Sequence, residues 1–248
     1  MISSQYLIII VLALLSGLTT IIGVLLAYLV KRKKKSISFG IGFSAGIMIF
    51  ISAFELLPES YQGMGFLKST VSFLLGGVLI ALLNKVIHHS HLVKEDGDHD
   101  CRFLRTAYIC AWGLIIHDFP EGFALANSYL HSVSFGILIS ISIALHNIPE
   151  EFAIAVPLVL AGKKKRLLFK MAFISALAEP IGATLGLFAV SFHPSFNLVF
   201  LSFAAGAMLY IAFHELIPLA RTYNQIRSSI MGLVGSLVIF LLLHFFMT

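Results

Sequence analysis

The chain has 248 residues, of which 58% are hydrophobic and only 12% are charged, and its formal net charge is +5. Soluble globular domains carry about 25% charged residues, so too little polar surface remains here to coat a water-soluble protein of this length. The composition therefore excludes a soluble globule and predicts an integral membrane protein.

Apolar runs of the length of a membrane-spanning helix follow one another along the chain. A helix needs about 20 apolar residues to cross a hydrocarbon core of about 30 Å, and the sequence lacks the short alternating segments of a membrane β-barrel. We therefore expect an all-α integral membrane protein with eight transmembrane helices, forming one domain over residues 1–248. The expected spans are about 6–30, 37–58, 66–87, 106–130, 133–161, 167–192, 197–220 and 229–247.

The basic residues lie in every second loop. Residues 31–35 follow the first span and residues 163–166 follow the fifth, whereas the opposite loops contain only Lys68. The positive-inside rule predicts that the basic loops are cytosolic and that both termini of this multi-pass plasma (inner) membrane protein are extracytoplasmic. Basic clusters beside spans are expected at a lipid bilayer, so no nucleic-acid partner is predicted.

An internal repeat joins the two ends of the chain. Residues 43–48 recur as residues 203–208 at an offset of 160, and the match continues through residues 55–58 and 215–218, which are Glu-Leu-Leu-Pro and Glu-Leu-Ile-Pro. In the predicted topology these two spans run in opposite directions, so spans 1–3 and 6–8 are interpreted as inverted repeats. This arrangement is typical of secondary transporters with a site near the membrane midplane. The alternative is that the small residues only pack helices together.

Two related motifs occupy the fourth and fifth spans. One reads His-Asp-Phe-Pro-Glu over residues 117–121, and the other reads His-Asn-Ile-Pro-Glu over residues 146–150. A His and a Glu four positions apart lie on the same face of a helix, and the intervening Asp or Asn adds an oxygen donor beside them. The proline of each motif cannot donate a backbone hydrogen bond, so we expect it to loosen the helix at this point.

Carboxyl groups concentrate at the same depth. A charged side chain at the bilayer centre costs at least about 2.5–3.5 kcal/mol, and almost no Lys or Arg lies at this depth to neutralise five of them. Their mutual repulsion predicts that several are protonated or that a metal ion is bound. The candidate metal ligands are His117, Asp118, Glu121, His146, Asn147, Glu150, Glu151 and Glu179.

The donor types restrict the ion. Imidazole, carboxylate and amide groups suit Zn²⁺, Fe²⁺, Mn²⁺ or Cd²⁺, whereas a dedicated Mg²⁺ or Ca²⁺ site would use oxygen ligands alone. The donors suffice for two neighbouring ions that share carboxylates. No organic cofactor is expected, and uptake should fall at acidic pH because metal ligands must be deprotonated.

These spans and motifs resemble the ZIP family of zinc and iron transporters, in particular its prokaryotic zinc-uptake branch. The resemblance implies a 3+2+3 helix bundle, a binuclear metal centre, alternating access and uptake of zinc into the cytosol. It implies that His117, Glu121, His146 and Glu150 hold one ion. Asp118, Asn147 and Glu179 would hold the second, with Glu121 and Glu150 bridging. A homodimer is compatible with the sequence.

The sequence departs from the family pattern at two positions. Asp118 stands where the family usually has Asn, and Glu151 stands where it usually has Gly. On a helix Glu151 lies one turn from Asn147, so it either reaches the second ion or packs against a Ser or Thr as a protonated acid.

Two other classes of protein remain open alternatives. An intramembrane metal-dependent hydrolase would use the ion to activate water, and it needs an open coordination position and a general base. A metal-sensing receptor would need a signalling domain. The near duplication of the two motifs fits an ion path better, so we expect a transporter and not an enzyme.

Further polar residues lie away from these motifs. The His- and acid-rich loop at about 88–105 is expected in the cytosol, where it either collects outgoing metal or is a solvated loop. Glu55 and the pair His214–Glu215 either flank the metal path or point to the nearest interface. The remaining histidines at helix ends, expected at the interface, are His131, His193 and His244.

Overall fold

The computed structural model describes residues 2–29, 34–89, 118–160, 162, 164–193 and 195–247. Within these ranges every regular element is a helix and no strand occurs, which confirms the all-α prediction for this part of the chain. The elements of the first half are α1 (Ile2–Gly17), α2 (Thr20–Leu29), α3 (Lys34–Ile51), the π-helix η1 (Ser52–Leu56), α4 (Leu57–Met64) and α5 (Phe66–His89). After a helical segment at residues 118–131 follow α7 (Val133–Leu160), α8 (Lys165–Ala176), α9 (Ala178–Phe192), α10 (Phe196–Ile211), the π-helix η2 (Ala212–Leu216), α11 (Ile217–Thr222) and α12 (Ile226–Met247).

Seven helical stretches among the described residues are long and apolar enough to cross a membrane. Each overlaps one of the predicted spans. The eighth predicted span, 106–130, is described only from residue 118 onward, where the chain is helical to residue 131. The seven stretches are Ser4–Leu29, Lys34–Met64, Phe66–Lys85, Val133–Val156, Lys165–Phe192, Phe196–Thr222 and Ile226–Phe246.

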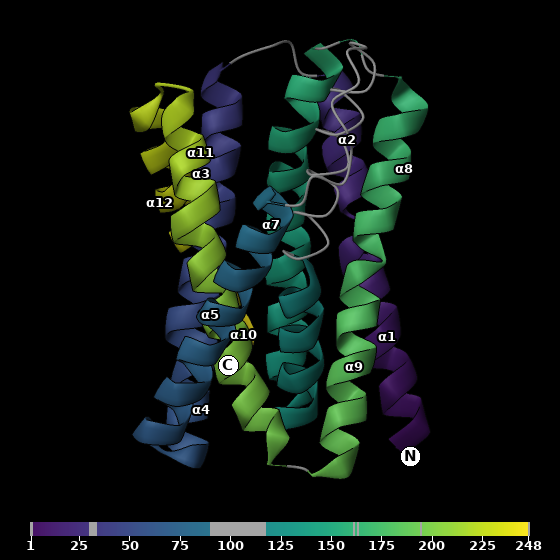
Figure 1. The fold of residues 1–248 in the computed structure, drawn as a ribbon, viewed down its shortest axis with the longest axis vertical. Coiled ribbons are helices and arrows are strands. Elements are labelled where there is room, and N and C mark those ends of the chain that lie inside the picture. Colours follow the sequence, from purple (N-terminus) through teal and green to yellow (C-terminus); the bar gives the residue numbers. More distant parts are fainter. Residues whose placement is uncertain are drawn as a thin grey trace.

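The helices form an elongated bundle with two sides (Figure 1). On the left of the view, α3 packs against α12 and α10 packs against α5. On the right lie α1, α2, α8 and α9, with α1 packed against α9. Helix α7 stands between the two sides and contacts both α2 and α3, and its residues 146, 147, 150 and 151 are buried.

Glycines allow the paired helices of the left side to touch. A Cβ atom on Gly206 would lie 1.9 Å from the carbonyl oxygen of Phe73, and one on Gly76 would lie 2.0 Å from that of Phe203. Gly42 makes an equally close approach to Ser229 between α3 and α12. Such close backbone approach is how small residues hold helices together in lipid.

The sequence offset of 160 recurs in the boundaries of the elements. Helix η2 begins 160 residues after η1, and α12 begins 160 residues after α5. Pro58 and Pro218 follow the two π-helices at equivalent positions. A proline ring clashes with the carbonyl four residues earlier, and the wider π turn relieves that clash.

Two of the spans that were predicted to be continuous helices are interrupted. Helices α1 and α2 are separated by a turn at residues 18–19, and α8 and α9 are separated at Leu177. The second break follows from Pro180, which has no N–H to donate to the carbonyl of Ala176 four residues earlier. At the first break the Thr19 hydroxyl donates to the carbonyl of Ser16 at 2.6 Å, in competition with the helical backbone.

Pro149 does not interrupt its helix, because α7 is continuous from Val133 to Leu160; that the proline loosens the helix stays a prediction. A membrane helix tolerates proline where neighbouring groups satisfy its carbonyls. In the turn before Pro149, the Thr19 hydroxyl donates to the carbonyl of Ala144 at 3.0 Å, next to the Leu145 carbonyl that the proline leaves without its helical donor.

Candidate metal centre

The segment 118–131 crosses α9 at very short range, and this crossing positions two of the candidate ligands. A Cβ atom on Gly122 would lie 1.9 Å from the carbonyl oxygen of Glu179, and one on Gly182 would lie 2.3 Å from that of Phe119. Because both contact positions are glycines, the two backbones touch. Asp118 and Glu121 therefore lie beside the start of α9, where Glu179 is found.

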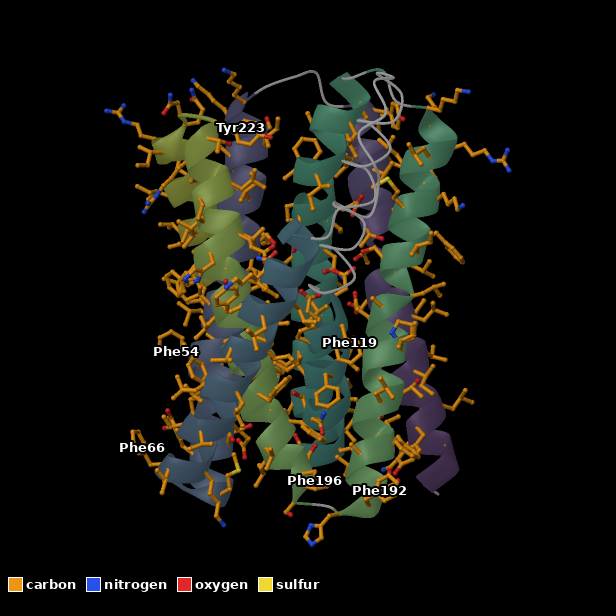
Figure 2. The ribbon with its side chains drawn as sticks, viewed as in Figure 1. Phe54, Phe66, Phe119, Phe192, Phe196 and Tyr223 are labelled. Carbon is orange, nitrogen blue, oxygen red and sulfur yellow. The ribbon has the colours of Figure 1, made fainter. Side chains whose placement is uncertain are left out.

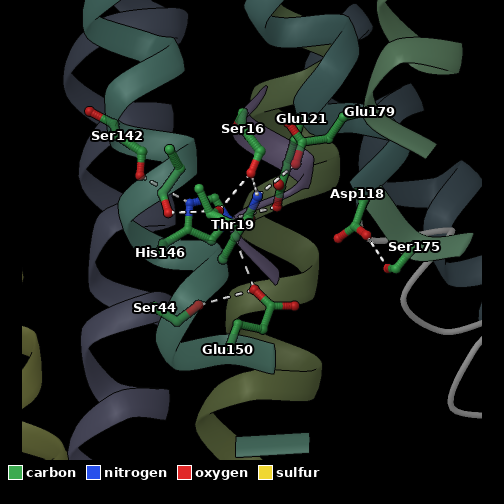
Figure 3. Close-up of polar contacts among 12 residues, drawn as sticks. Ser16, Thr19, Ser44, Asp118, Glu121, Ser142, His146, Glu150, Ser175 and Glu179 are labelled. Atoms are coloured by element: carbon green, nitrogen blue, oxygen red, sulfur yellow. Dashed lines mark hydrogen bonds and ion pairs between the residues drawn. The ribbon is translucent and has the colours of Figure 1, made fainter. Parts of the chain in front are cut away.

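Glu121, His146 and Glu150 form the most compact group of candidate ligands (Figure 3). The Nε2 atom of His146 lies 2.8 Å from Oε1 of Glu121 and 3.9 Å from Oε2 of Glu150. One donor atom from each residue lies within 4.8 Å of the other two, and all three side chains are buried. Three converging donors of this kind can hold a divalent transition metal.

The orientation of the His146 ring is fixed by its other nitrogen. Nδ1 lies 3.3 Å from the carbonyl oxygen of Ser142, which can only accept, so the tautomer with a proton on Nδ1 donates a hydrogen bond there. In that tautomer Nε2 directs its lone pair at Glu121. Two acceptors 2.8 Å apart require a proton or a cation between them, and a hydrogen bond from the second ring nitrogen is the usual support of a metal-bound histidine.

Asn147 and Glu179 form a second contact beside this group. Nδ2 of Asn147 donates to Oε1 of Glu179 at 2.6 Å and to the carbonyl of Ser16 at 3.3 Å. The amide nitrogen is thus engaged, and the amide oxygen is the atom with which Asn147 can coordinate a cation. No described residue donates a hydrogen bond to Oε2 of Glu179, a buried carboxylate oxygen.

Asp118 lies to one side of these contacts. The hydroxyl of Ser175 on α8 donates to Oδ2 of Asp118, and Figure 3 shows the pair set apart from Glu121 and His146. The structure thus brings Glu121, His146 and Glu150 together and joins Asn147 to Glu179, while Asp118 accepts a hydrogen bond from Ser175.

Glu151 faces a different neighbour. A Cβ atom on Gly23 of α2 would lie 2.8 Å from Cβ of Glu151, so this residue packs at the contact of α7 with α2. The side chain is buried, and its Oε2 receives no hydrogen bond from the residues that the structure describes.

His117 lies outside the described residues, as does most of the predicted cytosolic loop at 88–105. Asp118 is the first residue of its helix that the structure describes.

The charge balance of the region is strongly one-sided. The described residues include no buried Lys or Arg, and His146 is the buried imidazole among them. Buried carboxylates without compensating charge are costly, and several must therefore be neutralised by protons or by a bound cation. Those of this region are Asp118, Glu121, Glu150, Glu151 and Glu179.

Comparison with known proteins identifies the family. The family model of the ZIP zinc transporters matches residues 84–243. The chain belongs to the ZIP zinc transporter family. Zinc transporter ZupT of Chlorobaculum parvum is 34% identical over 250 residues, covering 92% of this chain and 93% of the relative. The same-named proteins of Stenotrophomonas maltophilia and Streptococcus mutans are 36% and 34% identical, and each alignment covers at least 92% of both chains.

These bacterial relatives confirm the resemblance to the prokaryotic branch of the ZIP family. The alignments span nearly the whole of each chain, so the similarity is not confined to the two central motifs. The ZIP family is one of transporters, which is a non-enzymatic role.

Three serines contact the candidate ligands of this ZIP protein but were missed in the sequence. Ser44 on α3 donates to Oε2 of Glu150 at 3.1 Å, and Ser16 and Ser175 contact Asn147 and Asp118. One signal was available for Ser44, because the repeat has Ala204 at the equivalent position and the two copies differ there in polarity. Ser16 acts through its backbone carbonyl, which a side-chain pattern cannot reveal.

The acidic residues of the two π-helices make equivalent contacts. Oε1 of Glu55 lies 2.6 Å from Nδ1 of His244, and the Asn84 amide donates to Glu215 at 3.0 Å. The partners His244 and Asn84 are themselves 160 residues apart, like the two glutamates.

The other histidines lie at the surface of the described structure. His131 forms a pair with Glu59 at 2.7 Å, and both side chains are about one-third exposed. His193 contacts Ser195, and His214 is exposed and stacks on Tyr210.

Proposed function

We propose that this chain carries Zn²⁺, or a related divalent cation such as Cd²⁺, Fe²⁺ or Mn²⁺, across the plasma membrane into the cytosol. The observation that carries the proposal is the buried convergence of Glu121, His146 and Glu150, in a ZIP protein whose bacterial relatives are named zinc transporters. The metal is the cargo of this site and not a resident cofactor.

The first ion is proposed to bind His117, Glu121, His146 and Glu150. The 2.8 Å and 3.9 Å distances from His146 Nε2 to the two glutamates support this assignment, since a cation between these atoms would replace the proton there. His117 lies four positions before Glu121 on the same helical face, which is the reason to include it.

The second ion is proposed to bind Asp118, Asn147 and Glu179, with Glu121 and Glu150 bridging. The contact between Asn147 and Glu179 supports this assignment. Asp118 would have to turn away from Ser175 to join. Glu151, one helical turn from Asn147, is proposed as a further ligand of the second ion.

The proposed architecture has eight spans in a 3+2+3 order, with spans 1–3 and 6–8 as inverted repeats and both termini extracytoplasmic. It is supported by the common offset of 160 in the π-helices and in α5 and α12. Alternating access would arise when the helices that carry the ligands shift against the pairs α3–α12 and α5–α10. In each of these pairs, glycines let the two helix backbones pack in direct contact.

The proposal is tested with purified protein in liposomes that contain a Zn²⁺-sensitive dye. We expect the dye to respond to external Zn²⁺ at a rate well above that of protein-free liposomes. Equilibrium dialysis of the detergent-solubilised protein with Zn²⁺ should give two bound ions per chain. Absence of flux for every divalent metal tried would overturn the transport proposal, and a stoichiometry of one would overturn the binuclear assignment alone.

A further inference from the structure

A cavity of about 510 Å³ lies between α3, α11 and α12, and none of its lining residues is a candidate metal ligand. Its floor is formed by the buried residues Ile41, Gly42 and Ala45 of α3 and Ala220 of α11. Its rim carries the exposed Ile226 and Ile230 of α12, so the cavity opens on the outer surface of the bundle. A cavity of this volume is large enough for part of a small amphiphilic molecule.

The polar groups of the cavity gather at one end. Arg221, Asn224 and Ser229 line it beside otherwise apolar side chains, and none of the described lining residues is acidic. Arg221 is exposed and lies one residue before the end of a membrane-competent stretch, and Ile226 begins the next. The polar end of the cavity therefore lies at the level of the lipid headgroups, near Tyr223 in Figure 2.

The apolar part runs from this level toward the hydrocarbon core. Leu233 lines the cavity seven residues beyond Ile226 on α12, which corresponds to a depth of about 10 Å at the rise of an α-helix. A cavity that is cationic at the interface and apolar below it has the polarity profile of a phospholipid with a negatively charged headgroup. Arg227, Lys34 and Lys35 begin helices at the same end and add positive charge there.

The equivalent site in the other copy of the repeat is lined differently, so the fold alone does not produce this cavity. The positions equivalent to Arg221, Ile226 and Leu233 carry Tyr61, Phe66 and Phe73, which are bulkier and uncharged. Tyr61 and Phe66 stack with their ring centroids 5.3 Å apart. One copy of the repeat therefore places aromatic rings where the other has an open slot and a guanidinium group.

We propose that this cavity binds an anionic phospholipid, with the phosphate at Arg221 and one acyl chain along Ile230 and Leu233. Basic pockets between membrane helices are known to bind acidic headgroups, and the guanidinium group suits a phosphate oxygen pair. The inference requires only that the chain lies in a membrane, so it stands or falls separately from the metal site.

The test uses delipidated full-length protein in a non-ionic detergent, titrated with phosphatidylglycerol or phosphatidylcholine and followed by native mass spectrometry. Wild-type protein should retain phosphatidylglycerol in preference to phosphatidylcholine. Arg221→Gln should weaken phosphatidylglycerol binding about fivefold, the effect of one basic residue near a membrane surface. Arg166→Gln, an equal charge change on the exposed start of α8, should leave binding unchanged.

A second pair of variants separates the cavity from general charge attraction. Ile230→Trp fills the slot without changing charge and should also reduce phosphatidylglycerol retention, whereas Leu241→Trp, at an equally exposed position of α12 outside the cavity, should not. Equal binding of the two lipids, or equal effects of Arg221→Gln and Arg166→Gln, would overturn the proposal.

Discussion

The paired helices of the left side differ from the helices that carry the candidate ligands in how their buried polar side chains are bonded. In the pair α5–α10, serine hydroxyls donate hydrogen bonds to the backbone of the neighbouring helix. Ser202 donates to the carbonyl of Ser69 at 2.6 Å, and Ser72 donates to that of Val199 at 2.6 Å. In α7, α9 and the segment 118–131, buried carboxyl groups instead face one another.

This difference indicates that the paired helices stabilise the fold, whereas α7, α9 and residues 118–131 provide the binding site. Satisfied hydroxyls and glycine contacts hold membrane helices together. Crowded carboxylates destabilise the protein unless a cation or protons join them, so their presence is explained by ligand binding. Substitutions on the two sides should therefore separate loss of stability from loss of transport.

The largest effect on transport is expected from Glu121→Gln. The amide keeps the shape of the side chain but removes a charged ligand, so Zn²⁺ uptake should fall by more than the about 10–100-fold that loss of a supporting contact costs. Thermal stability of the metal-free protein should be maintained or raised, because one buried charge is removed. The liposome dye assay and a melting curve measure the two quantities.

Glu59→Gln is the matched control for this prediction. Glu59 pairs at 2.7 Å with His131, and both side chains are about one-third exposed. This variant should transport like the wild type. If Glu59→Gln lost as much uptake as Glu121→Gln, the loss in Glu121→Gln could not be assigned to removal of a metal ligand.

The largest effect on stability is expected from Gly206→Ala. The added methyl would lie 1.9 Å from the carbonyl oxygen of Phe73, so α5 and α10 must move apart. Overpacking of this kind costs about 1–3 kcal/mol, and the melting temperature in detergent should drop. At Gly235 the same change meets only the rings of Phe39 at 3.7 Å and Phe43 at 3.9 Å, and it should leave the melting temperature unaltered. Equal shifts for the two variants would contradict the packing explanation.

An intermediate effect is expected from Ser44→Ala. The change removes the hydroxyl that donates to Glu150 at 3.1 Å and places in α3 the residue that the repeat has at Ala204. Loss of a hydrogen bond that supports a metal ligand lowers metal affinity about 10–100-fold, and we expect about tenfold here. Zn²⁺ titration of the purified variant measures this, with the exposed Ser191→Ala as control; an affinity equal to that of wild type would remove Ser44 from the site.

The smallest effect on transport is expected from Glu151→Gln. This side chain packs against Gly23 at the contact with α2, at the edge of the proposed second ion. We expect a smaller loss of uptake than for Ser44→Ala and a higher melting temperature, since a buried carboxyl group is replaced by a neutral amide. A loss as large as that of Glu121→Gln in the dye assay would instead make Glu151 a principal ligand.

The sequence predicted well which described segments are membrane-competent helices and where they lie, because the length of an apolar run is the main determinant of a membrane span. It did not predict the π-helices or the break at residues 18–19. These features depend on proline clashes and on hydroxyl-to-carbonyl bonds, which do not change the hydropathy of the run. Nor did the sequence predict that the Thr19 hydroxyl bonds to the carbonyl of Ala144 in α7, a contact between helices that hydropathy does not reveal.

The candidate site was predictable as a set of residues but not as a set of contacts. Helical spacing alone places Glu150 one turn from His146. Whether Asp118 reaches a metal ion or a serine depends on the packing of α8, from which Ser175 donates to it. The closeness of Glu121 to His146 likewise depends on the crossing of two helices, which a single sequence does not reveal.

The most direct test of the central claim compares two histidines in the same Zn²⁺ uptake assay. His146→Ala removes the buried imidazole that lies 2.8 Å from Glu121, and His193→Ala removes an exposed imidazole at the C-terminal end of α9. With both variants shown to be folded by gel filtration, uptake should vanish in the first and persist in the second. Wild-type uptake by His146→Ala would contradict the assignment of the metal path to this buried group.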